Sequence, residues 1–341
     1  MKTLLEDKRI LVTGGTGSVG QAIIPEILKY NPAVLRVLDV DETREFEMSK
    51  KLKDYSNVRF LLGDIREKDR LSRAMEDIDI VFHLASLKHV LACEYNPFEA
   101  VKTNVVGTQN LIDVALERET SKVIFASSDK AVNPCNVMGA TKLLAERLIT
   151  AANFYKGHRK SVFCSVRFGN VLGSRGSIIP LFKEQLHSGG PITLTDEKMT
   201  RFIMPVSQSV RLLLKAAELA HGGEVFVTKM DGVRIMDLAQ VIVEEICGQK
   251  AVKNKIRLVG RGPGEKLFEE IMTEGESERS LETEDLFIIL PEIKEFSQAT
   301  VNYMNAKPTQ TKTYSSENVK ILNKKEIKEF LRNNQISLDN D

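Results

Sequence analysis

The stretch RILVTGGTGSVG, residues 9–20, decides the fold. Its first half, Arg9–Thr13, is a short apolar run that predicts a buried strand, and the apolar residues that follow recur at helical spacing up to Asn31. Glycines between a strand and a helix are typical of a turn that binds a dinucleotide, because they permit a tight turn and a close approach of the backbone to a pyrophosphate. The residues expected to contact the dinucleotide here are Gly14, Thr16, Gly17, Ser18, Val19 and Gly20.

The next apolar run, Val34–Leu38, ends in Asp39, which lies 19 residues after Gly20. An acid at about this distance can bind the ribose hydroxyls of the adenosine half of a dinucleotide. Its charge would repel the 2′-phosphate of NADP, and Val40 rather than an arginine follows it. The sequence therefore predicts NAD as the cofactor.

Strand-like and helix-like segments alternate through most of the chain. Further strands are expected at 58–62, 78–84, 122–126, 162–166 and 224–228. This alternation predicts an α/β fold with a Rossmann-type, doubly wound parallel sheet and a smaller C-terminal α/β substrate-binding region. We expect an NAD-binding domain over residues 1–170, and a mainly substrate-binding region over 171–341 that is interleaved with it. Residues 274–313, where the periodicity fades, are expected to be irregular and partly exposed.

Residues that follow the third and fourth strands are candidates for the cofactor site. Asp64 could accept a hydrogen bond from the adenine amino group, and a simple turn acid is the alternative. Ile65 is a further expected contact. Ala85 is small enough for a close approach to the cofactor, and Lys88 could reach either the ribose or the substrate.

Composition narrows the classes of function. The 341 residues carry 48 lysines and arginines against 47 aspartates and glutamates, a formal charge of +1, which gives no support for a nucleic-acid surface. The 4 cysteines are scattered without paired spacing, so neither a disulfide framework nor a metal site is expected. No stretch approaches the roughly 18 apolar residues of a membrane span. Residues 1–8 lead directly into the first strand without a signal peptide, so we expect a cytoplasmic protein.

The stretch FASSDKAVNPCNVMGATK, residues 125–142, is the expected catalytic centre. The apolar run before it delivers Ser128, Asp129 and Lys130 to the carboxyl end of a strand, where open α/β sheets place their chemistry. A hydroxyl, a carboxylate and an ammonium in a row, with Lys142 on the helix that follows, can transfer protons. The alternative is an exposed ion pair that caps the strand.

The sequence resembles the extended short-chain dehydrogenase/reductase superfamily in TGGTGSVG (13–20), GDIR (63–66), HLASLKHV (83–90) and the SSDK…MGATK block. More narrowly, it resembles the UDP-N-acetylglucosamine 4,6-dehydratases of bacterial and archaeal surface-polysaccharide synthesis. The motifs that carry this second resemblance are SSDKAVNPCNVMGATK (127–142), RFGNVLGSRGSIIPLF (167–182), DEKMTRF (196–202) and RGPGEKLFEE (261–270). The resemblance covers about residues 8–270, with a looser match at 314–331. It implies a lyase that binds NAD tightly, acts on a UDP-sugar and forms a homo-oligomer.

In the reaction that this resemblance implies, C-4 of the sugar is oxidised by hydride transfer to NAD, water leaves across C-5 and C-6, and the hydride returns to C-6. Lys130 would take the C-5 proton, and Asp129 would protonate the departing 6-hydroxyl. Lys142 would bind the nicotinamide ribose and help to deprotonate the 4-hydroxyl. As a base, Lys130 needs a pKa below its usual value of about 10.4. Burial would lower that pKa, and the charge of Asp129 would raise it.

The residues that would hold the UDP group lie further along the chain. Asn170 and Ser177, in a donor-rich loop over 167–177, and Arg201 are the candidates, and ordinary loop-stabilising contacts are the alternative. Lys88 is a further candidate contact of the substrate. Glu265 is expected to bind the uridine ribose hydroxyls.

Three positions depart from the family pattern. Met138 stands where most members of the superfamily have the tyrosine of the YxxxK pair, as it does in some dehydratases of the group, and methionine is neither an acid nor a base. Ser128 replaces a threonine but keeps the hydroxyl. Arg261 precedes the usual arginine position, which is Gly262 here. We hypothesise that Ser128 or Asp129 takes the first proton in place of the tyrosine, directly or through water.

Two other functions stay open. A UDP-sugar C-4 epimerase uses the same cofactor and the same first hydride step, but it needs no base at C-5, so the Ser-Asp-Lys triplet argues against it. A non-catalytic, NAD-binding sensor is the other alternative. The retained Asp129, Lys130 and Lys142 argue against a sensor, which would not require all three.

Overall fold

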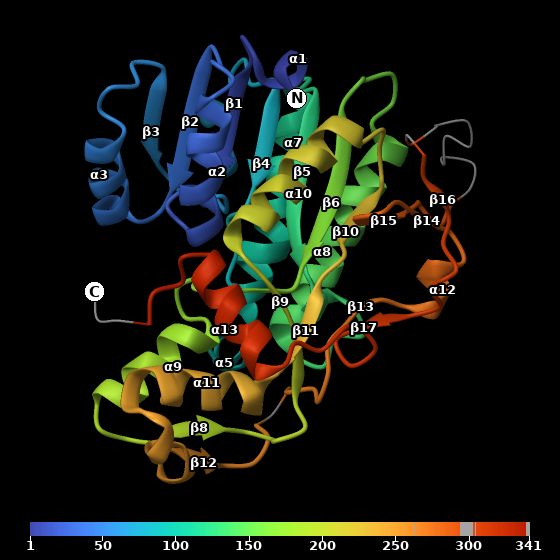
Figure 1. Ribbon diagram of the computed structural model, residues 1–341. Coiled ribbons are helices and arrows are strands. Elements are labelled where there is room, and N and C mark those ends of the chain that lie inside the picture. The colour runs from blue at the N-terminus through green and yellow to red at the C-terminus, as the bar shows by residue number, and fades with distance from the viewer. Residues whose placement is uncertain (263, 294–302, 304, 339–341) are drawn as a thin grey trace.

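A long, mostly parallel sheet forms the centre of the computed structural model, which describes residues 1–262, 264–293, 303 and 305–338 (Figure 1). Its strands are β1 (Arg9–Thr13), β2 (Val34–Asp39), β3 (Val58–Leu62), β4 (Ile80–His83), β5 (Lys122–Ser128), β6 (Val162–Phe168), β10 (Val225–Thr228), β14 (Ser280–Glu282), β15 (Leu286–Ile289) and β16 (Lys307–Pro308). Within the described residues they lie in the order β16-β14-β15-β10-β6-β5-β4-β1-β2-β3. Strands β1 to β6 and β10 run parallel, and β15 joins β10 in the antiparallel direction.

Helices cover both faces of this sheet (Figure 1). α2 (Ser18–Leu28) and α10 (Val206–Leu219) pack on one face, and α4 (Lys68–Ala74), α7 (Gly107–Glu117) and α8 (Val137–Tyr155) pack on the other. Strand β1 shows the alternation, because Ile10 and Val12 belong to the first core and Leu11 to the second. The predicted Rossmann-type, doubly wound sheet is confirmed. Shorter helices lie at its edges: α1 (Lys2–Leu5), α3 (Glu42–Lys51), α5 (Val90–Tyr95) and α6 (Pro97–Ala100).

The turn between β1 and α2 is tight against the neighbouring strand. Gly14 has a φ of +65°, and a Cβ at this position would lie 2.7 Å from backbone atoms of Ala85, just after β4. Any other residue would therefore be strained in its backbone and would collide with the chain beside it. The turn lies where the strand order reverses between β1 and β4, which is the point at which open α/β sheets bind ligands.

A smaller unit lies below the sheet in Figure 1. Helices α9 (Ile178–His187), α11 (Ile235–Cys247) and α13 (Lys324–Asn333) share an apolar core there, beside the parallel pair β8 (Ile192–Leu194) and β12 (Ile256–Leu258). Two further sheets are β7 (Asn170–Val171) with β9 (Thr200–Met204) and β11 (Asp231–Arg234), and β13 (Glu270–Met272) with β17 (Tyr314–Ser315). Because β10 and β14 to β16 return to the main sheet, the two halves of the chain share that sheet.

Residues 274–313 differ from the sequence-based prediction. Instead of irregular chain they contain α12 (Glu274–Ser277), β14, β15 and β16, and every residue of β15 is buried. Residues 294–302 and 304 of this segment lie outside the described part. The run Leu286–Ile289 is too short to show a period, so its strand character depends on its pairing with β10. Elsewhere in the chain, the π-helical turn η1 (Val101–Val106) joins α6 to α7, so these residues do not form one regular α-helix.

Arg167 was expected in the donor-rich loop, and this prediction was wrong. It belongs to β6, and its side chain is 1% exposed. Its guanidinium nitrogens lie 2.6 Å from a carboxylate oxygen of Glu146 on α8 and 2.7 Å from one of Glu276 on α12. The two carboxylates compensate its charge in the interior, so Arg167 joins the C-terminal segment to the main sheet.

Candidate active site

The predicted site residues, all of which are described, gather along one cavity of about 1340 Å³ at the carboxyl ends of the parallel strands. The glycine turn, Asp39, Lys142 and Arg201 all line this cavity, although they come from distant parts of the chain. Of the predicted set, only Asp129 is absent from the lining; it is 1% exposed. The cavity therefore brings the expected cofactor, catalytic and substrate residues together.

Asp39 is firmly oriented at the glycine turn. Its Oδ2 accepts hydrogen bonds from the amide (3.0 Å) and the hydroxyl (2.7 Å) of Thr16, and its Oδ1 accepts one from the Val40 amide at 2.8 Å. These contacts fix the carboxylate at the end of β2. Asp64, after β3, accepts a hydrogen bond from the Arg66 guanidinium at 2.7 Å. Burial would raise the pKa of Asp64, but the hydrogen bonds and charge of Arg66 outweigh burial and lower it.

A loop from the smaller unit lies against the glycine turn, and the sequence reasoning had assigned no role to its arginine. The Arg175 guanidinium donates to the carbonyl of Thr16, and the Arg175 amide donates to the Ser18 hydroxyl at 3.1 Å. Lys88 Nζ donates to the Arg175 carbonyl at 2.7 Å. Burial and the charge of Arg175 lower the pKa of Lys88. Two cations thus lie beside the turn that is expected to hold a pyrophosphate.

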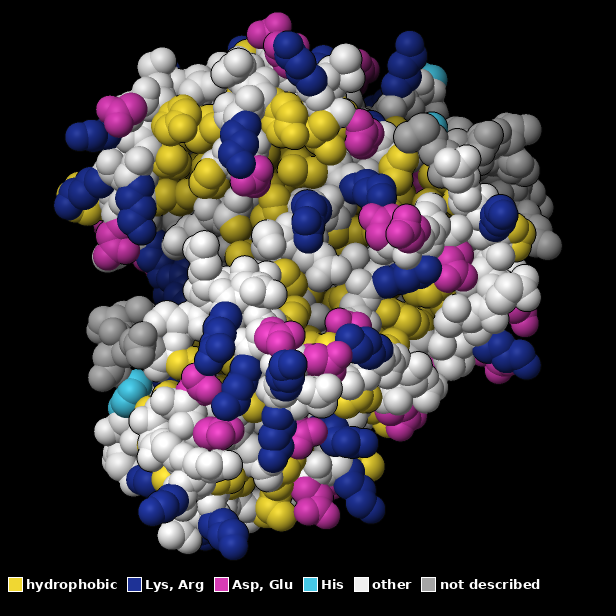
Figure 2. Space-filling model, viewed as in Figure 1, with side chains coloured by type: hydrophobic (Ala, Val, Ile, Leu, Met, Phe, Trp, Pro, Cys, Tyr) yellow, Lys and Arg dark blue, Asp and Glu magenta, His cyan; other side chains and the backbone are white. Residues whose placement is uncertain are grey.

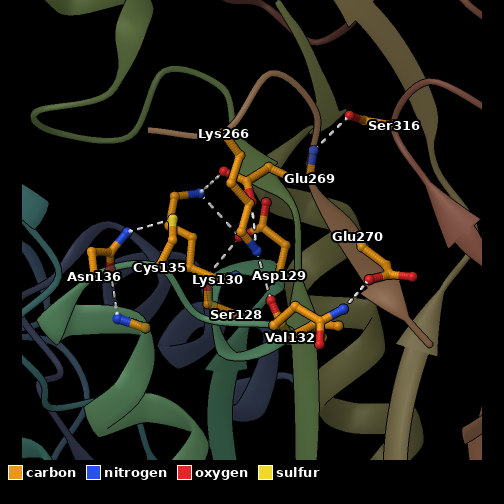
Figure 3. A network of polar contacts seen from close by, with 12 residues as sticks. Ser128, Asp129, Lys130, Val132, Cys135, Asn136, Lys266, Glu269, Glu270 and Ser316 are labelled. Carbon is orange, nitrogen blue, oxygen red and sulfur yellow. Dashed lines mark hydrogen bonds and ion pairs between the residues drawn. The ribbon is translucent and has the colours of Figure 1, made fainter. Parts of the chain in front are cut away.

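The Ser-Asp-Lys triplet forms a connected network at the end of β5 (Figure 3). Strand β5 ends at Ser128, and the chain then enters the short 3₁₀ turn η2 (Asp129–Ala131). The Ser128 hydroxyl donates to Asp129 Oδ1 at 2.7 Å, and Lys130 Nζ donates to the same oxygen at 3.0 Å. Lys130 Nζ also lies 3.4 Å from Asn170 Oδ1. Asp129 Oδ2 is buried and has no hydrogen-bond partner.

The pKa of Lys130 is raised, whereas a base would need it lowered. Burial alone would lower this pKa, but the charges of Asp129 and Glu269 together overcome burial, and the charge of Arg201 reduces the effect. Glu269 is a second carboxylate near the ammonium, with Oε1 at 3.6 Å from Nζ. Glu269 lies within the RGPGEKLFEE motif, but it was assigned no role, because nothing in the sequence places it beside Lys130, 139 residues earlier.

Lys142 lies on the first turns of α8. It is 5% exposed, and its Nζ donates to the Ala126 carbonyl at 2.9 Å. Burial lowers the pKa of Lys142 to about 7, and the weaker effects of Cys93 and Glu146 oppose it. Met138, one turn earlier, is buried. Gly139 brings this helix against the triplet, because a Cβ there would lie 2.2 Å from the Lys130 carbonyl oxygen.

The candidates for binding the UDP group differ in how many hydrogen bonds their side chains already make. The Ser177 hydroxyl, at the N-cap of α9, is buried without a hydrogen-bond partner. The Arg201 guanidinium donates to the carbonyls of Thr200 (2.7 Å) and Lys266 (2.9 Å), so it also fixes the backbone at these two residues. Glu265 accepts a hydrogen bond from the Gly262 amide at 3.0 Å.

The arginine that precedes Glu265 in this motif has an acidic partner. Arg261 Nε lies 3.7 Å from a carboxylate oxygen of Asp196. Pro263, in the same motif, lies outside the described residues. This geometry pairs Arg261 with Asp196.

Acidic and basic side chains are interspersed over the described part of the face in Figure 2, rather than gathered by sign. No helix in the described ranges is long and apolar enough to cross a bilayer. Among the same residues, no group of three or more His, Cys, Asp and Glu side chains could hold a metal ion.

Comparison with known proteins places the chain among sugar-modifying relatives. A family described as polysaccharide biosynthesis protein matches residues 10–291. The UDP-N-acetylglucosamine 4,6-dehydratase (inverting) of Campylobacter jejuni is 38% identical over 323 residues, 92% of this chain and 94% of the relative. The UDP-glucose 4-epimerase of Rickettsia bellii is 37% identical over 332 residues, 96% of each chain. A Methanocaldococcus jannaschii protein described as an uncharacterized membrane protein is 53% identical over 330 residues, also 96% of each.

Solved structures share the fold. Pen from Bacillus thuringiensis has a TM-score of 0.90 at 44% identity, covering 98% of this chain and 99% of that one. The dTDP-glucose 4,6-dehydratase DesIV from Streptomyces venezuelae, solved with NAD and TYD bound, has a TM-score of 0.69 at 22% identity, covering 76% of this chain and 86% of that one. At that identity the second likeness concerns the fold alone.

Proposed function

The chain belongs to the polysaccharide biosynthesis protein family, of the extended short-chain dehydrogenase/reductase type, and from this premise we propose that it is an NAD-dependent UDP-N-acetylglucosamine 4,6-dehydratase. The observation that carries the proposal is the contact of Asp129 with Lys130, whose side chain lines the same cavity as Lys142 and the glycine turn. A base and an acid side by side are what the removal of water from a 4-keto sugar requires. The Campylobacter relative supports the choice of sugar. The product would be a UDP-4-keto-6-deoxy sugar for surface glycans.

The residues at the glycine turn fit NAD. A Cβ at Gly17 would meet only the Gly14 carbonyl oxygen within 4 Å, so backbone surface is open to a pyrophosphate next to the start of α2. Asp39 would accept hydrogen bonds from the adenosine ribose, while Lys88 and Arg175 would face the phosphates. When bound, NAD would accept a hydride from C-4 of the sugar and return it to C-6. Lys142 would hold the nicotinamide ribose.

The Asp129–Lys130 pair would supply both the base and the acid. In the unliganded site the proton resides on Lys130, because the carboxylates raise its pKa. Lys130 Nζ lies 3.0 Å from Asp129 Oδ1, so one proton shift along this hydrogen bond gives a neutral amine and a carboxylic acid. Sugar binding would exclude water and favour this neutral pair. Lys130 then takes the C-5 proton, and Asp129 protonates the departing 6-hydroxyl.

The first proton, from the 4-hydroxyl, needs an acceptor other than Met138. Lys142 is suited to this role, because burial lowers its pKa to about 7 and a large fraction is neutral at neutral pH. Ser128 offers a second route: its hydroxyl already donates to Asp129 and can accept a proton at the same oxygen. Over the whole reaction, the proton released from the 4-hydroxyl balances the one that Asp129 gives to the departing 6-hydroxyl.

The UDP group would lie between the smaller unit and β7. The unpartnered Ser177 hydroxyl and the first amides of α9 suit a phosphate, since a helix N-terminus attracts anions. Arg201 would add a cation, and Asn170 would help to orient the sugar against Lys130. Glu265 remains the expected contact of the uridine ribose.

A UDP-sugar C-4 epimerase is the second candidate, favoured by the Rickettsia relatives. It would use the same cofactor half of the cavity and the same Lys142. The Asp129–Lys130 pair would then be a structural contact rather than a base and an acid. The two functions therefore differ in whether the reaction depends on this pair.

Product analysis tests the proposal. We would load the protein with NAD, add UDP-N-acetylglucosamine and follow the sugar by NMR and mass spectrometry. A UDP-4-keto-6-deoxy sugar is the expected product. UDP-N-acetylgalactosamine without loss of water would instead identify an epimerase, and unchanged sugar beside bound NAD would support a sensor.

A further inference from the structure

Glu269 is a buried carboxylate that the mechanism above does not use. It lines the cavity and is 3% exposed. Its Oε1 lies 3.6 Å from Lys130 Nζ and 3.7 Å from Arg201 Nε, and its Oε2 lies 4.0 Å from Lys266 Nζ. Its Oε2 has no hydrogen-bond partner. Figure 3 shows Glu269 in the same network as Lys130, Asp129 and Lys266.

On the basis of the proposed function, we infer that Glu269 is a positioning residue for the elimination step, which fixes the ammonium of Lys130 beside the guanidinium of Arg201. It thereby connects the proposed C-5 base to a residue that would hold the nucleotide. The two carboxylates of Asp129 and Glu269 are balanced by Lys130, Arg201 and Lys266. A buried carboxylate among cations is stable only when that geometry is kept.

The C-terminal part of the chain holds Glu269 in this place. The Glu269 amide donates to the Ser316 hydroxyl at 3.0 Å, and the Ser316 amide donates back to the Glu269 carbonyl at 2.8 Å. Strand β13 begins at the next residue and pairs with β17. Hydrogen bonds of its amide and its carbonyl therefore fix the backbone of Glu269. From this position its carboxylate contacts the ammonium of Lys130, just after the end of β5.

Removing the charge of Glu269 has a predictable effect on Lys130. The charged groups that face the ammonium are Asp129 on its own turn, Glu269 before β13 and Arg201 on β9, and Asn170 on β7 is the neutral one. Without the charge of Glu269, the positive charge of Arg201 is compensated by one carboxylate fewer and acts more strongly on Lys130. The pKa of Lys130 should then fall by about 1–3 units, the range observed for a neighbouring opposite charge.

A pH profile distinguishes this role from a merely structural one. The variants are Glu269→Gln, Glu269→Asp, and Glu270→Gln as the matched control, since Glu270 is the adjacent glutamate and contacts Asn133 instead. The rate of dehydration in a single turnover is measured against pH for each NAD-loaded protein. The reacting pair carries a single proton, so the rate should fall at high pH where that proton is lost. In E269Q this falling limb should move by about 1–3 units to lower pH, with a lower plateau. E269D should show a smaller shift in the same direction, and E270Q none.

A second readout does not depend on the sugar. The side-chain carbon next to Nζ of Lys130 is followed by NMR in protein labelled with ¹³C-lysine, with Lys130→Met to assign the signal. The signal should titrate at lower pH in E269Q than in wild type, with E269D between them; E269D also serves if E269Q does not fold. An unchanged titration in both variants would overturn the role of Glu269. If wild type titrates as expected but makes no 4-keto-6-deoxy sugar, the proposed function fails and the link between Glu269 and Lys130 stands.

Discussion

Two buried lysines near the end of β5 have pKa values that are shifted in opposite directions. Lys142 donates to the Ala126 carbonyl and has no carboxylate within hydrogen-bond reach in the described structure, so burial lowers its pKa to about 7. Lys130 faces two carboxylates, and they raise its pKa despite burial. In the proposed mechanism, Lys142 is therefore ready to accept a proton, whereas Lys130 becomes a base only after it has given its proton to Asp129.

Replacing Lys130 should separate the two halves of the reaction. In Lys130→Met the C-4 oxidation should persist, and dehydration should fall by about 10²–10⁴-fold, the usual contribution of a positioned base. The absorbance of the reduced nicotinamide would then accumulate after UDP-N-acetylglucosamine is added. Lys102→Met, at a lysine that is 43% exposed and paired with Glu99, is the control and should react like wild type. Equal loss of oxidation and dehydration in K130M would assign Lys130 to the first step.

The lowered pKa of Lys142 predicts the pH dependence of the first step. Only the neutral amine accepts a proton, so the rate of nicotinamide reduction should rise about tenfold per pH unit below pH 7 and level off above it. Stopped-flow absorbance measured from about pH 5.5 to about pH 9 would record this dependence. A rate that falls with rising pH would show that the charged form of Lys142 is the active one.

At the scale of elements, two contacts join segments that are far apart in the chain. The loop before α9 lies on the glycine turn through Arg175, and β6 is tied to α8 and α12 through the buried Arg167. The first contact connects the cofactor half of the cavity to the smaller unit. The second contact connects the C-terminal segment, which carries Glu269 and β13, to the main sheet.

Loss of the Arg175 side chain should weaken the retention of NAD. The guanidinium holds the loop on the Thr16 carbonyl, and hydrogen bonds made by a charged group contribute about 1.5–3 kcal/mol. We expect Arg175→Ala to release NAD about 10–100-fold faster in a dissociation assay. Lys198→Ala removes an exposed cation of the smaller unit and should leave the rate unchanged. Identical release from both variants would exclude Arg175 from the cofactor site.

Loss of Arg167 should reduce stability strongly. Arg167→Met leaves Glu146 and Glu276 buried without a cation, which costs about 3–5 kcal/mol of the free energy of unfolding. The exposed pair of Lys215 and Asp285 is the comparison, and Lys215→Met should cost about 0–1 kcal/mol. Denaturant unfolding of both variants measures the difference. Similar losses would mean that the buried network contributes no more than a surface ion pair.

In the molecule as a whole, the features that could be predicted from the sequence are those that depend on residues close together in the chain. The glycine turn, the parallel strands and the Ser-Asp-Lys triplet are local patterns, and they appear where expected. Glu269 and Arg167 could not be predicted, because a buried charge looks like any surface charge until its partners, more than 20 residues away, are known. The short strand β15 was missed for the same reason. The homo-oligomer, the cytoplasmic location and the individual site roles stay predictions.

The most direct test of the central claim is the isotope at C-5 after reaction in deuterated water. The NAD-loaded protein would be incubated with UDP-N-acetylglucosamine in D₂O, and the product would be analysed by NMR and mass spectrometry. The account predicts a UDP-4-keto-6-deoxy sugar with deuterium at C-5, because Lys130 exchanges its proton with solvent before it reprotonates that carbon. An epimerised sugar that keeps its 6-hydroxyl and has no deuterium at C-5 would contradict it.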